Sequence, residues 1–324
     1  MRLLPVRLLF LTIAGTLGLV EVVFAEETRF PRELTHWVPD PHAPIFEAAG
    51  PGTWEVKIRE RGWIDRSENL WRMWYTGYDG TRAGVKSLGY ATSQDGIRWT
   101  RSGDKPVYDQ SWVEDVCVLQ VDGTWQLFCE GQGDRAQRLT STDGVHWEHQ
   151  GPLDVRYQSG TPLTAGPFGT PTVWQEKGVW HLFYERGDRG IWLARSKDVK
   201  TWVNVQDEPV LSPGPEDYDR DLIAMNQIIR YQDRYYAVFH GAKFPAVSGA
   251  QSLWATGLAV SDDLVRWEKY AGNPLRPISE NKSSGLLIHD GQKYLLYTMH
   301  GQVVRHVPSG EASGEGKAGK QDSK

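Results

Sequence analysis

The chain has few cysteines, no excess of basic over acidic residues and almost no helical periodicity. With 36 Lys and Arg against 41 Asp and Glu, its formal net charge is −5, and no basic stripe indicates a nucleic-acid partner. The spacings of a zinc site, a nucleophile elbow and a phosphate-cradling glycine loop are all absent. The two cysteines, Cys117 and Cys129, fall on two strands of one predicted hairpin. A disulfide is open to them, and two buried thiols are the interpretation that we prefer.

The first residues have the pattern of a secretory signal peptide. Arg2 and Arg7 form a positive segment, an apolar run covers residues 8–20, and Val23-Phe24-Ala25 supplies the small residues of a cleavage site. Glu21 interrupts the apolar run, which is too short to span a bilayer comfortably. We therefore expect residues 1–25 to be removed, and the protein to be a secreted or periplasmic monomer without a membrane partner.

Tryptophan is abundant, with 15 residues, and four of them close a repeated motif. Each copy is a tight polar turn of Ser-x-Asp type between apolar segments. The copies recur at roughly 50 residues, a period typical of propellers and repeat arrays. They are Ser93–Trp99, Ser141–Trp147, Ser196–Trp202 and Ser261–Trp267.

A second element recurs, and each copy is a strand-length run of aromatic, aliphatic and β-branched residues. Turn signals such as Asp122-Gly123 and Asp290-Gly291 come before most copies, and an apolar strand comes before the turn. Each unit is therefore interpreted as four antiparallel strands, A to D, with the polar turn between C and D. The copies are Trp71–Gly77, Trp125–Gly131, Trp180–Arg186, Tyr235–Gly241 and Tyr294–His300.

These repeats predict an all-β fold, a five-bladed β-propeller of four-stranded antiparallel blades within residues 26–308. Only one strand remains after His300, so we expect an N-terminal strand within residues 33–46 to complete the last blade and remove the exposed edges. A β-sandwich is the alternative, but it does not explain the number of repeats. Residues 309–324 are rich in Gly, Ser, Lys and Glu and are expected to form a disordered tail.

In a propeller, strand A lines the central axis, and the residues that begin strand A or end strand B meet at one funnel. Counting back from the A–B turns aligns Asp115 with Thr170, Asn226 and Ser283, and Glu55 is the nearest match in the first unit. The funnel is thus expected to be densely polar. Its predicted residues are Glu55, Glu114, Asp115, Glu130, Glu185, Arg186, Asn226, His240, Lys243 and His300, with Asp219, Arg220 and Asp221 nearby.

Carboxylates that face one bond are what glycoside hydrolysis requires, because one protonates the leaving oxygen and the other acts as base or nucleophile. Crowding also raises the pKa of one carboxyl, which helps it serve as the acid. Simpler interpretations remain open, since Glu130 and Glu185 could pair with arginines, and His240 and His300 with Asp or backbone groups. The aspartates of the repeated turns are expected to be turn formers at the outer wall. Candidates for sugar stacking, with core packing as the alternative, are Trp112, Trp174 and Trp254.

The blade pattern, Glu114-Asp115 at the head of the second inner strand and the segment Lys269–Pro274 resemble the five-bladed propeller glycosidases. These are glycoside hydrolase families 43, 32 and 117 and the family 130 mannoside phosphorylases. Inverting family 43 enzymes use an Asp from blade one, an Asp from blade two and a Glu from blade three. The resemblance implies this blade-two role for Asp115.

The chain also departs from the family 43 pattern. The blade-one Asp is missing, and the third inner strand carries Thr170-Pro171-Thr172 where a Glu is expected. Glu185, at the end of strand B in that blade, is the available substitute. Family 117 is similar in using a His as the proposed acid, which makes His240 or His300 a candidate. The Asn-Asp-Pro-Asn segment of family 32 is absent.

The first hypothesis is an exported, exo-acting, inverting glycoside hydrolase of a plant or algal poly- or oligosaccharide. Asp115 acts as base or orienting group, Glu185 as the acid, and Glu55 or Glu114 as the remaining carboxylate. No cofactor or metal-ligand set is indicated, and a structural cation on the axis stays open. The residues expected to bind the carbohydrate are Glu130, Arg186, Asn226, Asp221, His240 and His300.

Two other hypotheses remain. A non-catalytic carbohydrate-binding propeller predicts binding without turnover. A phosphorylase related to family 130 predicts turnover that depends on phosphate, and it needs a basic phosphate subsite. The cations available for that subsite are Arg186, Arg189, Arg220 and Lys243.

Overall fold

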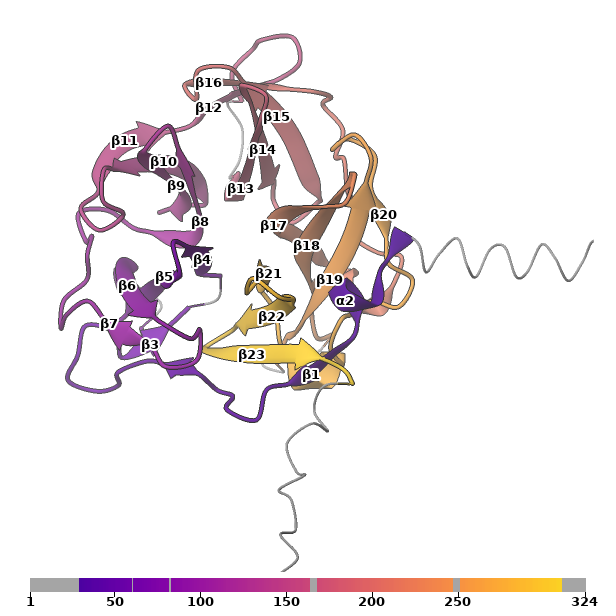
Figure 1. Ribbon diagram of the computed structural model, residues 1–324. Helices are drawn as coiled ribbons and strands as arrows, with labels where there is room; N and C mark the ends of the chain where they lie inside the picture. The colour runs from indigo at the N-terminus through magenta and orange to yellow at the C-terminus, as the bar shows by residue number, and fades with distance from the viewer. Residues whose placement is uncertain (1–28, 60, 82, 164–167, 247–250, 311–324) are drawn as a thin grey trace, which may run out of the picture.

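The computed structural model describes residues 29–310, except residues 60, 82, 164–167 and 247–250. Regular structure in this part of the chain is almost all β-strand, gathered into five mainly antiparallel sheets around a common centre (Figure 1). The predicted five-bladed β-propeller is confirmed. The proposed signal peptide, residues 1–25, and residues 311–324 of the proposed tail lie outside the described residues.

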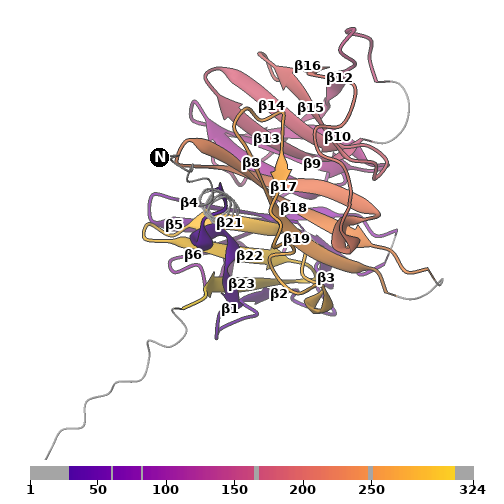
Figure 2. The same ribbon diagram turned by 90° about the vertical axis from the view of Figure 1, so that its right-hand side faces the viewer.

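Four blades follow the chain in order, each with its first long strand nearest the centre (Figure 1). Seen from the side, blade four faces the viewer (Figure 2). Blade one contains β3 (Lys57–Ile58), β4 (Trp63–Ser67), β5 (Leu70–Tyr78), β6 (Ser87–Ser93) and β7 (Thr100–Arg101); blade two contains β8 (Glu114–Val121), β9 (Thr124–Gly131), β10 (Arg135–Ser141) and β11 (Glu148–Pro152); blade three contains β12 (Asp154–Arg156), β13 (Gly169–Glu176), β14 (Val179–Glu185), β15 (Ile191–Ser196) and β16 (Thr201–Asn204); blade four contains β17 (Leu222–Tyr231), β18 (Arg234–Lys243), β19 (Leu253–Ser261) and β20 (Glu268–Lys269).

Blade five is built from both ends of the described chain. β21 (Gly285–His289), β22 (Tyr294–Met299) and β23 (Gln302–Pro308) come last, and β1 (Trp37–Pro39) pairs antiparallel with β23. β2 (Phe46–Glu47) pairs with the other end of β23. The predicted closure by a strand within residues 33–46 is confirmed. The described helical segments are short: α2 (Arg32–Thr35), η1 (Asp217–Asp219) and η2 (Ile278–Glu280).

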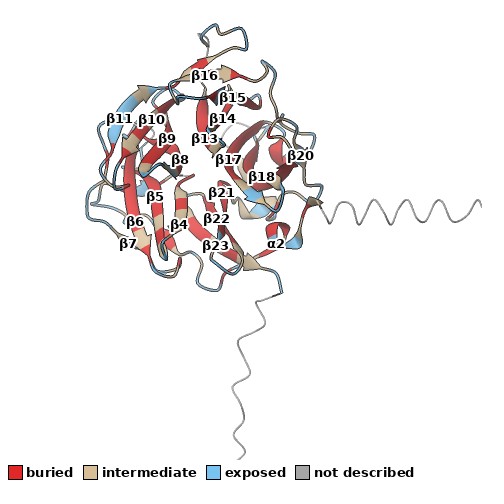
Figure 3. Cartoon of the chain, turned by 45° about the horizontal axis from the view of Figure 1, so that its top comes forward, coloured by how far each residue is buried: buried red, intermediate tan, exposed pale blue. Residues whose placement is uncertain are grey.

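Aromatic packing joins neighbouring blades. Trp74 of blade one donates its indole N–H to the carbonyl of Gly144 in blade two, at 2.8 Å, and its ring lies 5.2 Å from that of Trp125. Trp202 of blade three meets Phe128 of blade two edge-on, at 6.0 Å. Buried residues accordingly follow the strands, and exposed residues gather in the loops (Figure 3).

One further sequence-based question, the state of the two cysteines, is settled by the structure. Cys117 and Cys129 are both buried free thiols, so the interpretation without a disulfide is confirmed. Within residues 29–310, gaps excepted, no helix has the length and apolar character needed to cross a membrane.

The repeated Ser-x-Asp motif forms the turn between the third and fourth strands of a blade. In the first copy, Oδ1 of Asp95 accepts hydrogen bonds from the N–H groups of Ile97, at 2.9 Å, and Arg98, at 2.8 Å. The Ser93 hydroxyl accepts one from the N–H of Gly96, at 2.9 Å. Because the Asp carboxylates satisfy backbone donors of the turn, their role is structural.

We expect Asp95→Ala to lower the free energy of unfolding by about 1 kcal/mol, because two turn N–H groups lose a protein acceptor. Chemical denaturation measures the loss. Asp104→Ala, in an exposed loop, is the control and should leave stability unchanged. A large fall in turnover by Asp95→Ala at unchanged stability would contradict the structural role.

Candidate active site at the ends of blades two and three

The inner strands of blades two and three lose register with their neighbours near their first residues. Glu114 pairs with Glu130, and Gly169 pairs with Glu185, immediately before a shift of register. Asp115 lies inside the first of these bulges and has a φ of 51°. Bulges re-aim side chains and are common beside functional sites. Glu130 lies at the end of β9 and Glu185 at the end of β14, each opposite the start of the bulged inner strand of its blade. The two glutamates are therefore at the same end of the propeller.

Glu130 and Glu185 lie on either side of Gly169. A Cβ atom at Gly169 would be 2.9 Å from the carboxyl carbon of Glu130 and 3.2 Å from Oε1 of Glu185. These two glutamate atoms are therefore at most 6.1 Å apart, the sum of the two distances. The N–H of Thr170 donates to Oε2 of Glu130 at 2.9 Å, and the N–H of Asp188 donates to Oε2 of Glu185, also at 2.9 Å. Both carboxyl groups are thus fixed by backbone donors.

Both glutamates have raised pKa values. Burial raises the pKa of Glu185 to about 7, and the nearby carboxylates of Asp188 and Asp134 raise it too, against a hydrogen bond from the Asp188 backbone. Burial also raises the pKa of Glu130 well above its usual value, and the carboxylates of Asp115 and Asp134 add to the rise. Burial and crowded negative charge are the environment in which a carboxyl keeps its proton near neutral pH.

A cavity of about 620 Å³ opens beside Glu130, toward blade one, and Glu185 is not among the residues that line it. Trp112 donates its indole N–H to Oε2 of Glu114 at 2.8 Å, and Arg59 forms an ion pair with the same carboxylate. The Lys86 ammonium lies 4.2 Å from the ring centre of Tyr78 and 4.5 Å from that of Trp112. Cations and carboxylates therefore face one solvent-accessible space, whose lining residues are Arg59, Tyr78, Gly80, Lys86, Trp112, Glu114, Glu130, Gly133 and Asp134.

Arg61 is a residue that the sequence analysis missed. It is fully buried, and its guanidinium donates to the carbonyl of Pro171 and to the Thr172 hydroxyl, the latter at 2.8 Å. The cation thus links blade one to blade three. Its charge also interacts with Asp115, and burial lowers the pKa of Arg61. The sequence signal was a pair of arginines, Arg59 and Arg61, shortly before the short strand Trp63–Ser67.

Glu55 does not occupy the inner position that the sequence analysis gave it. The inner strand of blade one is interrupted between Ile58 and Trp63, and the N–H of Arg59 bonds the carbonyl of Thr76 in this gap. The position aligned with Asp115 therefore falls within residues 59–62. Glu55 is instead buried against Arg101, which donates Nε–H to its Oε1.

His240, Asn226 and His300 lie at the corresponding ends of blades four and five, beside an aromatic cluster. Nδ1 of His240 is 2.7 Å from Oδ1 of Asn226, and Nδ1 of His300 is 2.8 Å from the Ser283 hydroxyl. The Trp254 ring lies between the two histidines, 5.6 Å from His240 and 6.2 Å from His300. Burial, with the charge of Arg61 and the proximity of His300, lowers the pKa of His240 to about 3, so this ring is neutral.

Arg186, Asp221, Arg220 and Lys243, which were also predicted to lie at the funnel, contact residues other than Glu130 and Glu185. Nη2 of Arg186 is 3.0 Å from the Tyr157 hydroxyl, and its guanidinium lies over the Tyr157 ring. Asp221 accepts from Arg220 at 2.8 Å and from the N–H of Phe244. Lys243 and Arg220 each form an ion pair with Asp217. In the described part of the chain, no group of three or more His, Cys, Asp or Glu side chains could hold a metal ion.

Sequence comparison finds distant relatives. No protein-family model matches the chain. A 1,2-beta-oligomannan phosphorylase from Thermoanaerobacter sp. (strain X514) is 27% identical over 173 residues, which cover 49% of this chain and 54% of the phosphorylase. The match therefore spans about half the length of that relative.

Solved structures with similar folds cover most of the chain. A glycosyl hydrolase from Bacteroides ovatus matches with a TM-score of 0.64 at 16% identity, covering 84% of this chain and 93% of its own. The β-1,2-mannobiose phosphorylase from Listeria innocua matches with a TM-score of 0.60 at 13% identity, covering 84% and 96%. This chain has the fold of the propeller glycosidases. The catalytic domain of a GH62 α-L-arabinofuranosidase from Coprinopsis cinerea agrees, with a TM-score of 0.60 at 13% identity over 85% and 97% of the two chains.

Proposed function

We propose that this propeller is an exported, exo-acting, inverting glycoside hydrolase with Glu185 as its general acid. The main support is the environment of the Glu185 carboxyl: burial raises its pKa to about 7, so it can donate a proton near neutral pH. It lies beside a second buried carboxyl, Glu130, at the same end of a fold shared with glycosidases. A protonated acid near other carboxylates is the arrangement that glycosidic bond cleavage uses.

Asp115 is the base in this proposal. Inverting enzymes keep the two carboxyl groups about 6.5–9.5 Å apart, which leaves room for a water molecule. The upper bound of 6.1 Å between the carboxyl carbon of Glu130 and Oε1 of Glu185 is shorter than that range. We therefore assign the base to Asp115, which lies near the start of the inner strand of the same blade as Glu130 and interacts with the charge of Arg61. Glu114, held by Arg59 and Trp112, is the remaining carboxylate.

The aromatic cluster around Trp254 supports a carbohydrate substrate. An indole ring offers an apolar face for stacking on a sugar, and His240 and His300 flank this one with groups able to hydrogen-bond hydroxyls. Phe244, which is 37% exposed, extends the aromatic surface, with its ring 6.4 Å from that of Trp254.

A phosphorylase is the second candidate, and two observations favour it. The curated relative at 27% identity is named as a phosphorylase, and Arg59 and Lys86 bring positive charge to the cavity wall. Of the cations first considered for a phosphate subsite, Arg220 and Lys243 are paired with Asp217 and Asp221. Arg59 is itself paired with Glu114, so among the cations of the cavity wall the case for phosphate rests mainly on Lys86.

Turnover with and without inorganic phosphate tests the proposed function. β-1,2-Linked mannooligosaccharides and a panel of plant and algal oligosaccharides are incubated with the mature protein, and the products are identified by NMR. We expect free sugar, released at the same rate without phosphate and first formed with inverted anomeric configuration. If a sugar 1-phosphate forms, and only when phosphate is present, the protein is a phosphorylase and the proposal of a hydrolase is wrong. Binding without any product would identify a non-catalytic propeller.

A further inference from the structure

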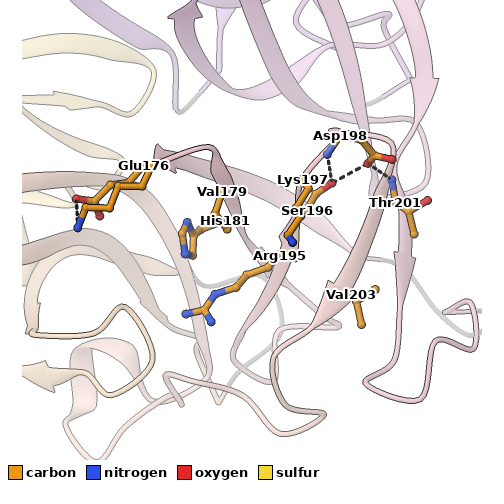
Figure 4. Close-up of a pocket in the computed structure, with 10 residues that line it drawn as sticks. Glu176, Val179, His181, Arg195, Ser196, Lys197, Asp198, Thr201 and Val203 are labelled. Carbon is orange, nitrogen blue, oxygen red and sulfur yellow. Dashed lines mark hydrogen bonds and ion pairs between the residues drawn. The ribbon is translucent and has the colours of Figure 1, made fainter.

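A second cavity lies on blade three, at the end of the blade away from the glutamates. It has a volume of about 640 Å³. Glu185 ends β14, whereas the cavity is lined by residues at the start of β14, the end of β15 and the turn between β15 and β16 (Figure 4). Nothing in the proposed catalytic arrangement uses it.

The cavity carries cations that have no counter-ion in the described part of the protein. The side chains of Arg195 and Lys197 line it and are exposed, with neither an ion pair nor a side-chain hydrogen bond among the described residues. Its two acidic residues are already engaged. Glu176 accepts from Arg230 at 2.7 Å and from Tyr235 at 2.5 Å, while Oδ1 of Asp198 accepts from two backbone N–H groups of its own turn. In a chain of net charge −5, this cavity therefore favours an anion.

The floor of the cavity combines apolar surface with an unsatisfied polar atom. Val179 and Val203 contribute aliphatic side chains. In Figure 4, His181 lies beside Val179, and Val203 lies on the other side of Arg195. His181 is 7% exposed, and its Nδ1 has no hydrogen-bond partner. Burial and the charge of Arg195 lower the pKa of this histidine, against backbone hydrogen bonds at Trp174 and Val179 that raise it. A buried polar atom without a partner calls for a ligand or water.

We propose that this cavity binds an acidic sugar unit, with the carboxylate or sulfate on Arg195 and Lys197 and the ring against Val179, Val203 and His181. A planar guanidinium is well suited to either anion. The site goes beyond the proposed function, because it lies at the other end of the blade and takes no part in bond cleavage. It would hold an acidic saccharide chain whether or not the same protein cleaves it.

Direct binding tests this site. The mature protein, labelled at valine methyl groups, is titrated with glucuronate, glucose 6-sulfate, glucose and inorganic sulfate. We expect both acidic sugars to shift the methyl resonances of Val179 and Val203, and glucose to leave them unchanged. Arg195→Gln with Lys197→Gln should weaken this binding at least about tenfold, since charge-assisted hydrogen bonds are lost. The matched control is Lys200→Gln, an exposed cation of the same turn that does not line the cavity.

The outcomes separate the parts of the proposal. A response to glucuronate alone or to glucose 6-sulfate alone supports the site and identifies the anionic group. Unchanged affinity in the double variant overturns the site, as does equal binding of glucose. Equally tight binding of inorganic sulfate overturns the sugar part and leaves a bare anion site. Turnover by the glutamates is measured separately, so loss of one proposal leaves the other intact.

Discussion

Glu185→Gln should lower kcat by about a hundred- to ten-thousand-fold on a natural oligosaccharide, because the amide cannot protonate the departing oxygen. The wild-type rate should fall as pH rises above about 7, where the Glu185 carboxyl loses its proton. In the variant, this alkaline limb should disappear. Steady-state kinetics from pH 5 to 9 measure both effects.

An activated substrate distinguishes a proton donor from a structural residue. An aryl glycoside with a nitrophenol leaving group needs little protonation, so Glu185→Gln should affect its turnover far less. Glu148→Gln, an exposed glutamate on the outermost strand of blade two, is the matched control and should leave kcat unchanged. Equal losses on both substrates would rule out Glu185 as the acid.

Arg61→Met should lower the free energy of unfolding by about 3–5 kcal/mol, the usual effect of removing one partner from a buried charge pair. The variant removes the hydrogen bonds to Pro171 and Thr172 and takes the compensating cation from Asp115. Urea denaturation followed by tryptophan fluorescence gives the free energy of unfolding from the midpoint and the slope of the transition.

Two further variants show whether charge compensation is the cause. Adding Asp115→Asn to Arg61→Met should recover part of the lost stability, because the uncompensated carboxylate is removed as well. Arg266→Met removes a side chain that is 90% exposed and paired with Asp263, and should change stability by less than about 0.5 kcal/mol. Similar losses in the Arg61 and Arg266 variants would contradict a special role for the buried cation.

The fold could be predicted because its signals are local and repeated. The turns ending at Trp99, Trp147, Trp202 and Trp267 recur at roughly 50 residues, and strand-length runs of aromatic, aliphatic and β-branched residues lie between them. Even the closing strand could be anticipated, since one blade lacked its fourth strand. Repeated local patterns leave few other ways to pair these strands.

The site was only partly predictable, because it depends on contacts between blades. Glu185 and Asp115 could be placed at strand ends by counting residues. Nothing local shows that Gly169 lets Glu130 approach Glu185, since the absence of one side chain acts on residues of two other strands. The alignment failed in blade one because the inner strand is interrupted there, and counting assumes an unbroken strand. The role of Arg61 could not be predicted either, because its hydrogen bonds join blade one to Pro171 and Thr172 of blade three.

The pairing of β1 with β23 also has a consequence for folding. During synthesis, Trp37–Pro39 emerges long before its partner Gln302–Pro308. Its backbone N–H and C=O groups therefore stay unpaired with β23 while the first four blades are synthesised. The ring then closes through the hydrogen bonds between β1 and β23, the packing of Trp37 in the core and the ion pair of Asp40 with Arg305. The strand ends that carry the candidate site residues therefore reach their final positions only when the last strand pairs. Weakening this pairing would affect the proposed active site without changing any of its residues.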